Sequence, residues 1–247
     1  LTRKCNGQVA LEESAISIQN HPWRERVAQW CYDVVDHLGA SREVVYHAMN
    51  ILDRYLAASC EEGSMDKLDY ELASIASLFL ALRVSGAMNL KVTELLQMSR
   101  SGLQIKDILS TGTIILEALS WEHRILTPTD FVKAILGLLQ SAIDCNTCLS
   151  LYELSSYLVE ISVCDQYFYR IPPSKIAFVA LLVAMKCDPD CAIDRNTLTH
   201  FIHVVHQETG MSLDSADTKS LFSLLQCLYN RTQDSSPVTL PHVIIDE

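Results

Sequence analysis

The chain has 247 residues and a formal net charge of −11, with 49% hydrophobic and 20% charged residues. This length suits one large domain, or two of about 120 residues each, with a sizeable core. The acidic balance argues against nucleic-acid binding, which needs a basic patch, and the longest strongly apolar run, 176–185, is too short to cross a membrane.

The first half of the chain has the pattern of a helical bundle. No proline occurs between residues 23 and 127, and apolar residues recur there with helical spacing between turn-type clusters of Gly, Ser and Glu. The pattern predicts helices at 23–38, 42–58, 66–83, 91–98 and 104–119. The third is apolar on nearly all sides, which is typical of a helix surrounded by others. The preceding segment, 1–21, is mixed in character, and its residues 9–18 suit a short docking helix.

A second helical series begins at the TPTD stretch of residues 127–130. It predicts helices at 129–143, 147–164, 173–187, 194–207 and 214–230, and again the third is apolar on all sides. We therefore expect two copies of one five-helix unit, at 22–127 and 128–231. The remaining residues, 232–247, are expected to form a loose tail.

Four short motifs occur in the order that a known family shows. They are WRERVAQW at 23–30, DRYL at 53–56, FLALR at 79–83 and TPTDF at 127–131. The first three resemble the helices of a cyclin box, and the fourth resembles the hinge of D-type cyclins, as does Pro172-Pro173-Ser174 farther on. The resemblance implies an all-α fold of two tandem five-helix cyclin boxes.

The resemblance also implies a function. A cyclin is a regulatory subunit that binds a cyclin-dependent protein kinase and orders its mobile helix αC, so we expect a role in cell-cycle control and a nuclear and cytoplasmic location. One alternative is a cyclin-fold scaffold or transcription-related module that activates no kinase. Another is a metal-binding or enzymatic helical domain, although no catalytic motif is present and we expect no enzyme activity.

Two residues stand at positions that the family uses to contact the kinase. By resemblance, Arg83 replaces a lysine; the charge is kept, but the geometry of the contact changes. Gly112 replaces the family's glutamate at this interface. The neighbouring positions on the same helix face are all apolar, so no other acid substitutes for it. Gly112 therefore favours the alternative without kinase activation.

Two further groups of residues follow from the resemblance. Arg24 and Asp53 are expected to form a buried ion pair between the first two helices, with a structural rather than a chemical role. A second group corresponds to the patch on which cyclins dock short Arg-x-Leu peptides of substrates or inhibitors, although an apolar stripe of this kind is also typical of a helix core. Its members are Trp23, Val27, Trp30, Asp33 and Glu71.

Several cysteines and histidines are candidate metal ligands. Cys187, Cys191 and three histidines at 200, 203 and 206 lie close in sequence, but histidines spaced by three residues spread around a helix. Nine cysteines without a secretion leader favour reduced, buried thiols. We therefore expect a soluble, intracellular protein that needs no metal or other cofactor.

Overall fold

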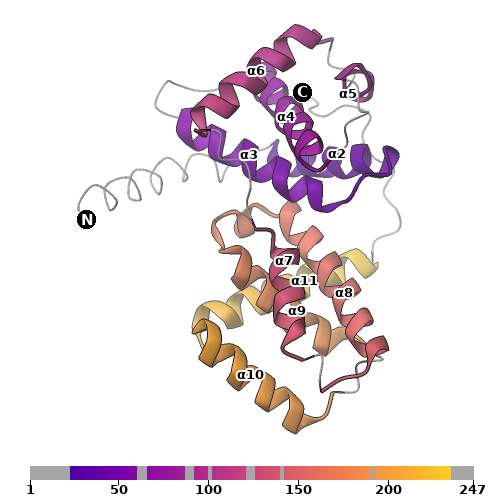
Figure 1. The fold of residues 1–247 in the computed structure, drawn as a ribbon, viewed down its shortest axis with the longest axis vertical. Coiled ribbons are helices and arrows are strands. Elements are labelled where there is room, and N and C mark those ends of the chain that lie inside the picture. Colours follow the sequence, from indigo (N-terminus) through magenta and orange to yellow (C-terminus); the bar gives the residue numbers. More distant parts are fainter. Residues whose placement is uncertain are drawn as a thin grey trace, which may run out of the picture. The chain divides into compact units, whose positions relative to one another are not determined.

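The computed structural model describes residues 23–59, 66–86, 92–99, 102–120, 126–139, 142–189, 191 and 193–234. Within these ranges the chain forms ten α-helices and one short 3-10 helix, with no strand (Figure 1). The all-α prediction is therefore confirmed. The docking helix expected within residues 1–21, and most of the tail expected at 232–247, lie outside the described residues.

The five helices of the first half agree closely with the predicted ones. They are α2 (Arg24–His37), α3 (Glu43–Ser59), α4 (Lys67–Val84), α5 (Val92–Ser99) and α6 (Ile105–Ala118). The central helix, α4, packs against α3, α5 and α6 (Figure 1). Its residues 73–78 are all buried, and several of them are Ala or Ser, whose small side chains allow neighbouring helices to approach closely.

Local signals explain where these helices begin and end. After α2, Gly39 has a φ of +63°, a left-handed conformation that glycine adopts without strain. The side chain of Asp66 accepts a hydrogen bond of 2.8 Å from the Asp69 N–H and so caps α4. A capping box of Gln104 and Asp107 opens α6. These caps satisfy the backbone groups that a helix end leaves unpaired.

The second half contains five α-helices and the 3-10 helix. They are α7 (Pro128–Gly137), α8 (Cys145–Cys164), η1 (Gln166–Arg170), α9 (Pro173–Cys187), α10 (Arg195–Thr209) and α11 (Ala216–Asp234). The apolar helix α9 is central and packs against α7 and α11. Thr127 and Asp130 form a capping box at the start of α7, where Pro128 occupies the first helical position.

Three predictions for the second half are corrected. Helix α7 ends at Gly137 rather than 143, because turn hydrogen bonds follow at Leu138 and Leu139. The 3-10 helix η1 was not predicted; it begins where the Asp165 side chain accepts a hydrogen bond from the Tyr167 N–H. Helix α11 continues to Asp234, so the first three residues assigned to the loose tail are helical.

The chain divides into two compact units, and neither unit is one continuous stretch of sequence. The second unit begins at Leu126, but the segment Val163–Tyr169 belongs to the first unit. Val163 is part of the hydrophobic core of the first unit, together with residues of α2, α3, α4, α5 and α6. The sequence had assigned this segment to the second half, at 128–231.

Candidate functional site

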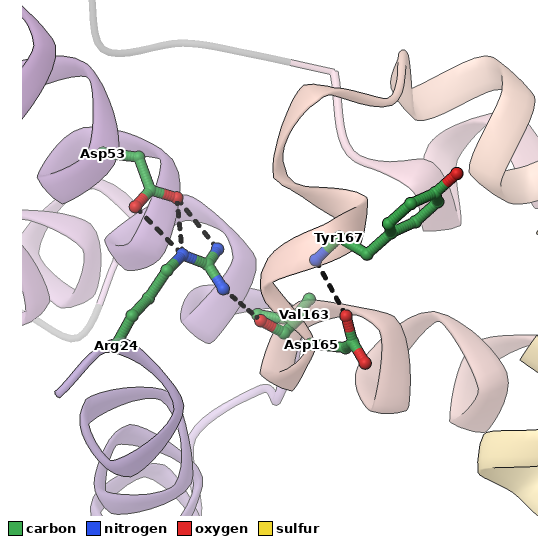
Figure 2. A network of polar contacts seen from close by, with 5 residues as sticks. All are labelled: Arg24, Asp53, Val163, Asp165 and Tyr167. Carbon is green, nitrogen blue, oxygen red and sulfur yellow. Dashed lines mark hydrogen bonds and ion pairs between the residues drawn. The ribbon is translucent and has the colours of Figure 1, made fainter. Parts of the chain in front are cut away.

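Arg24 and Asp53 form a buried ion pair in the first unit (Figure 2). Arg24 lies at the start of α2, and Asp53 lies in α3. The Nε atom donates to Oδ1 at 3.1 Å and Nη2 donates to Oδ2 at 2.9 Å, a two-pronged geometry that suits a guanidinium and a carboxylate. Since the residues are 5% and 2% exposed, water cannot replace either partner. The pair therefore fixes α2 to α3.

The guanidinium of Arg24 also binds the segment Val163–Tyr169. Its Nη1 atom donates a hydrogen bond of 3.0 Å to the Val163 carbonyl (Figure 2), and its Cζ atom lies 5.8 Å from the centre of the Tyr169 ring. Sequence reasoning missed this contact. Val163 is 139 residues away from Arg24, and a main-chain carbonyl acceptor has no signature in the side chains.

Burial and charge act in opposite directions on this pair. Burial alone would lower the pKa of Arg24, but Asp53 outweighs it and the pKa is raised. Burial raises the pKa of Asp53, and Arg24 counteracts that rise. Neither group faces solvent where it could exchange protons with a substrate. The geometry therefore indicates a structural role rather than a catalytic one.

A partly apolar surface lies where α4 and α6 meet in the first unit. We call it the α4–α6 face and define it by Leu80, Arg83 and Val84 of α4 and Ile105, Leu109 and Gly112 of α6. Positions 80, 83 and 84, like 105, 109 and 112, share one side of their helix. The two sides adjoin because the Leu80 side chain lies over Gly112. Val84, Ile105 and Leu109 are 48%, 41% and 46% exposed.

The two candidate kinase-contact residues both belong to this face. Arg83 is exposed near the end of α4, and its Cζ atom lies 6.0 Å from the centre of the Phe79 ring. Gly112 is buried in α6, and among the described residues a Cβ atom added there would meet only the Leu80 side chain, at 3.8 Å or more. That distance is ordinary contact, so packing within this unit does not require a glycine. None of the six residues of the face is acidic.

The candidate peptide-docking patch is mostly closed. Val27 is fully buried in the core of the first unit. It cannot contact a peptide and is therefore excluded from the candidate patch. Trp23 is half-buried, with its ring edge-on to Tyr70 at a centroid distance of 5.5 Å. Trp30 is only 9% exposed. Its indole Nε1 has no hydrogen-bond partner among the described residues.

The two acids of the patch differ in accessibility. Asp33 is half-buried and Glu71 is buried. Burial raises the pKa of Asp33, while a hydrogen bond with Gln29 acts against the rise. Burial likewise raises the pKa of Glu71, and Lys67 acts against it. A basic group that reached these carboxylates would favour their charged form.

The described residues do not form a metal site. No three of their His, Cys, Asp or Glu side chains lie together in a way that could hold an ion. The three histidines of α10 are exposed, and Nδ1 of His206 lies 3.1 Å from the Met211 carbonyl oxygen. None of the helices in the described ranges is both long enough and apolar enough to cross a membrane.

Comparison with known proteins identifies the family. The model of the cyclin N-terminal domain matches residues 4–124, and that of the cyclin C-terminal domain matches residues 126–237. The chain is 27% identical to a G2/mitotic-specific cyclin-B of Emericella nidulans, over 75% of this chain and 37% of the relative. It is 23% identical to the G1/S-specific cyclin-D1 of Mus musculus, over 68% of this chain and 63% of the relative.

The fold has a counterpart among solved structures. A viral cyclin from Herpesvirus saimiri superposes with a TM-score of 0.67 at 18% sequence identity, and the match covers 84% of each chain. The two family models together span all of the described helices, so the resemblance of the sequence motifs is confirmed. The chain therefore belongs to the cyclin family.

Proposed function

We propose that this protein is a regulatory subunit that binds a cyclin-dependent protein kinase and activates it in cell-cycle control. It would act by pressing the α4–α6 face against the kinase's mobile helix αC, so that the kinase's Lys–Glu pair forms and ATP is held productively. Cyclins are regulatory subunits, and we propose no catalytic activity for this chain itself. By the same reasoning, we propose that it acts in the nucleus and cytoplasm.

One observation carries the proposal. Three large apolar side chains of the α4–α6 face, Val84, Ile105 and Leu109, are more than 40% exposed in one unit of the protein. Apolar side chains gathered on one exposed surface often mark a protein interface. A helix is a suitable partner, because an amphipathic helix can lay its apolar side into the junction of two helices.

Gly112 supports a second candidate, a cyclin-fold scaffold that binds its partner without activating it. The face lacks an acid at the position where the family resemblance leads us to expect one. The Leu80 side chain covers this site instead. The scaffold would keep the apolar contact of the α4–α6 face but would not orient the kinase helix for activity.

Docking of short peptides of substrates or inhibitors is a further part of the proposal. The Nε1 of Trp30 supports it: this buried donor has no partner within the described part of the chain, which costs free energy that a peptide carbonyl would recover. Such a peptide would approach between Trp23 and Asp33, the more accessible members of the patch. A Trp30→Phe variant that loses peptide affinity while keeping its thermal stability would support this role.

Purified components test the main proposal. The recombinant protein is mixed with a panel of purified cyclin-dependent kinases, and both binding and phosphorylation of a standard substrate are measured. A Leu109→Asp variant should lose binding without unfolding, because Leu109 is exposed; Leu149→Asp, at a similarly accessible leucine in α8 (56% exposed against 46%), is the control. Binding with activity supports the main proposal, binding without activity supports the scaffold, and no binding refutes both.

A further inference from the structure

Helix α8 has an outer side on which apolar and acidic residues alternate. Four residues share this side, because each lies three or four positions after the one before it. They are Leu149, Glu153, Tyr157 and Glu160, all in the second unit, and we call them the α8 face. Leu149 and Tyr157 are 56% and 37% exposed, and Glu153 is exposed as well. A partner can therefore reach both the apolar and the acidic side chains of this face.

Contact with α11 holds the tyrosine of the α8 face in place. The Tyr157 ring stands edge-on to the ring of Tyr229, with a centroid distance of 6.4 Å and an interplanar angle of 76°. Tyr229 is half-buried, so it supports one side of Tyr157 while the other side remains exposed. A large ring that is already positioned loses little conformational freedom when a partner covers it, and tyrosine is enriched where proteins bind each other.

The charges of α8 are all of one sign. The helix contains Glu153 and Glu160 but no lysine or arginine. The two glutamates are seven residues apart, which is two helical turns, so they lie about 10 Å apart along the same side. Glu153 forms no ion pair within the described part of the chain. The face therefore favours a partner that carries positive charge.

We propose that the α8 face binds a basic amphipathic helix of a partner protein. Two lysines or arginines seven residues apart on that helix would pair with Glu153 and Glu160, and an apolar residue between them would pack on Tyr157. A helix repeats at the same interval as the two glutamates, whereas an extended strand covers that distance in about three residues. The α8 face belongs to the second unit and the proposed kinase contact to the first, so either can hold without the other.

Two other occupants match the charge of the face less well. If a second copy of this chain brought its own α8 face, glutamates would lie against glutamates, because α8 has no cation to offer. Residues 235–247 of the same chain contain Asp246 and Glu247 but no lysine or arginine, so the face would repel them too. A basic helix meets neither difficulty.

A synthetic helical peptide of about 20 residues, with leucines on one side and two arginines seven residues apart, serves as the probe. Its affinity for the whole protein is measured by fluorescence anisotropy at physiological salt, where charges more than about 8 Å apart are largely screened. Glu153→Arg should weaken binding about tenfold. Glu208→Arg makes the same change in net charge at an exposed position of α10 and should alter the affinity less than about twofold.

Two further measurements test the apolar contact and the charge pairing separately. Leu149→Gln should weaken binding about fivefold, because it removes apolar area that the peptide covers. Leu109→Gln changes an exposed leucine of the first unit and should have no effect. A second peptide with glutamates in place of the two arginines should bind the wild type poorly and should bind Glu153→Arg better than the wild type.

The opposite results would overturn the inference. A peptide that does not bind refutes it, and equal weakening by Glu153→Arg and Glu208→Arg would mean that net charge alone attracts the peptide. If the wild-type protein self-associates in sedimentation and Leu149→Gln abolishes the association, the face pairs two copies of the chain instead. If the peptide binds only after residues 235–247 are deleted, that segment covers the face. Kinase binding in the purified panel, tested separately through Leu109, affects none of these outcomes.

Discussion

At the scale of single residues, Arg24 makes several buried contacts within the first unit. It donates to both oxygens of Asp53 and to the Val163 carbonyl. We predict that Arg24→Met lowers the free energy of unfolding by about 3–5 kcal/mol, because it leaves the carboxylate of Asp53 buried without a partner. The double variant Arg24→Met/Asp53→Leu should be more stable than Arg24→Met alone. Chemical denaturation of the three proteins measures both differences.

An exposed pair in the same unit serves as the control. The Nη1 atom of Arg42 lies 2.6 Å from the Oδ2 atom of Asp36, but the two side chains are 41% and 49% exposed. Water screens and replaces such a contact, so Arg42→Met should cost about 1 kcal/mol or less. If the Arg24 and Arg42 variants lose equal free energy of unfolding, burial does not make the Arg24–Asp53 pair more costly to break, and the prediction is wrong.

Glu71 gives a pH-dependent prediction. Burial raises its pKa above the ordinary value of 4.5, so the folded state favours the neutral carboxyl group. The corresponding stability is fully present below the unfolded-state pKa and is lost as the pH rises through the folded-state pKa. Glu71→Gln should therefore raise the Tm at pH 7, and its advantage should disappear below about pH 4. Thermal melts over this pH range, with the exposed Glu153→Gln as control, measure the effect.

Side-chain chemistry made some of these residues predictable and left others hidden. Arg24 and Asp53 were recognisable as a buried pair through the resemblance to a cyclin box, and a guanidinium and a carboxylate suit each other inside a protein. The Val163 carbonyl was not, since every residue has one. The position of Val27 was ambiguous for a different reason: one apolar stripe on α2 serves equally well for a core and for a docking surface, and only packing decides between them.

At the scale of secondary-structure elements, α6 contains a glycine that the packing of the unit does not need. A Cβ atom at position 112 would make only ordinary contact with Leu80, and glycine inside a helix costs about 1 kcal/mol relative to alanine. We predict that Gly112→Ala stabilises the protein by about that amount in chemical denaturation. Because alanine adds no charge, kinase affinity should change by less than about twofold. If Gly112→Ala instead destabilises the protein, α4 and α6 pack too closely at this point to leave room for a Cβ atom beside Leu80.

The predictability of the elements depends on their local signals. The helices of the first half were predicted to within one residue at each end, because glycines such as Gly39 and caps such as Asp66 mark their ends. The end of α7 was misplaced, because the apolar spacing continues beyond Gly137 after the helix has ended. The 3-10 helix η1 was missed because a single short turn has too few residues to show a periodicity.

At the scale of the whole chain, the first unit is discontinuous in sequence. It takes in Val163–Tyr169, which falls within the range matched by the C-terminal family model, 126–237. Family matches and helix periodicity follow the order of the sequence, so neither could reveal this. Only three-dimensional contacts do, through the buried side chain of Val163 and the hydrogen bond that its carbonyl accepts from Arg24.

This arrangement predicts that a substitution in the segment Val163–Tyr169 weakens the first unit. Val163→Ala removes two buried methyl groups and should cost about 2 kcal/mol of unfolding free energy. Hydrogen exchange should then speed up at the amides of α2 and α3, which share a core with Val163. Tyr167→Ala is the matched control: this side chain is 52% exposed, so exchange in α2 and α3 should not change. If Val163→Ala instead speeds exchange only in α7 and α9, the segment stabilises the second unit and the assignment to the first is wrong.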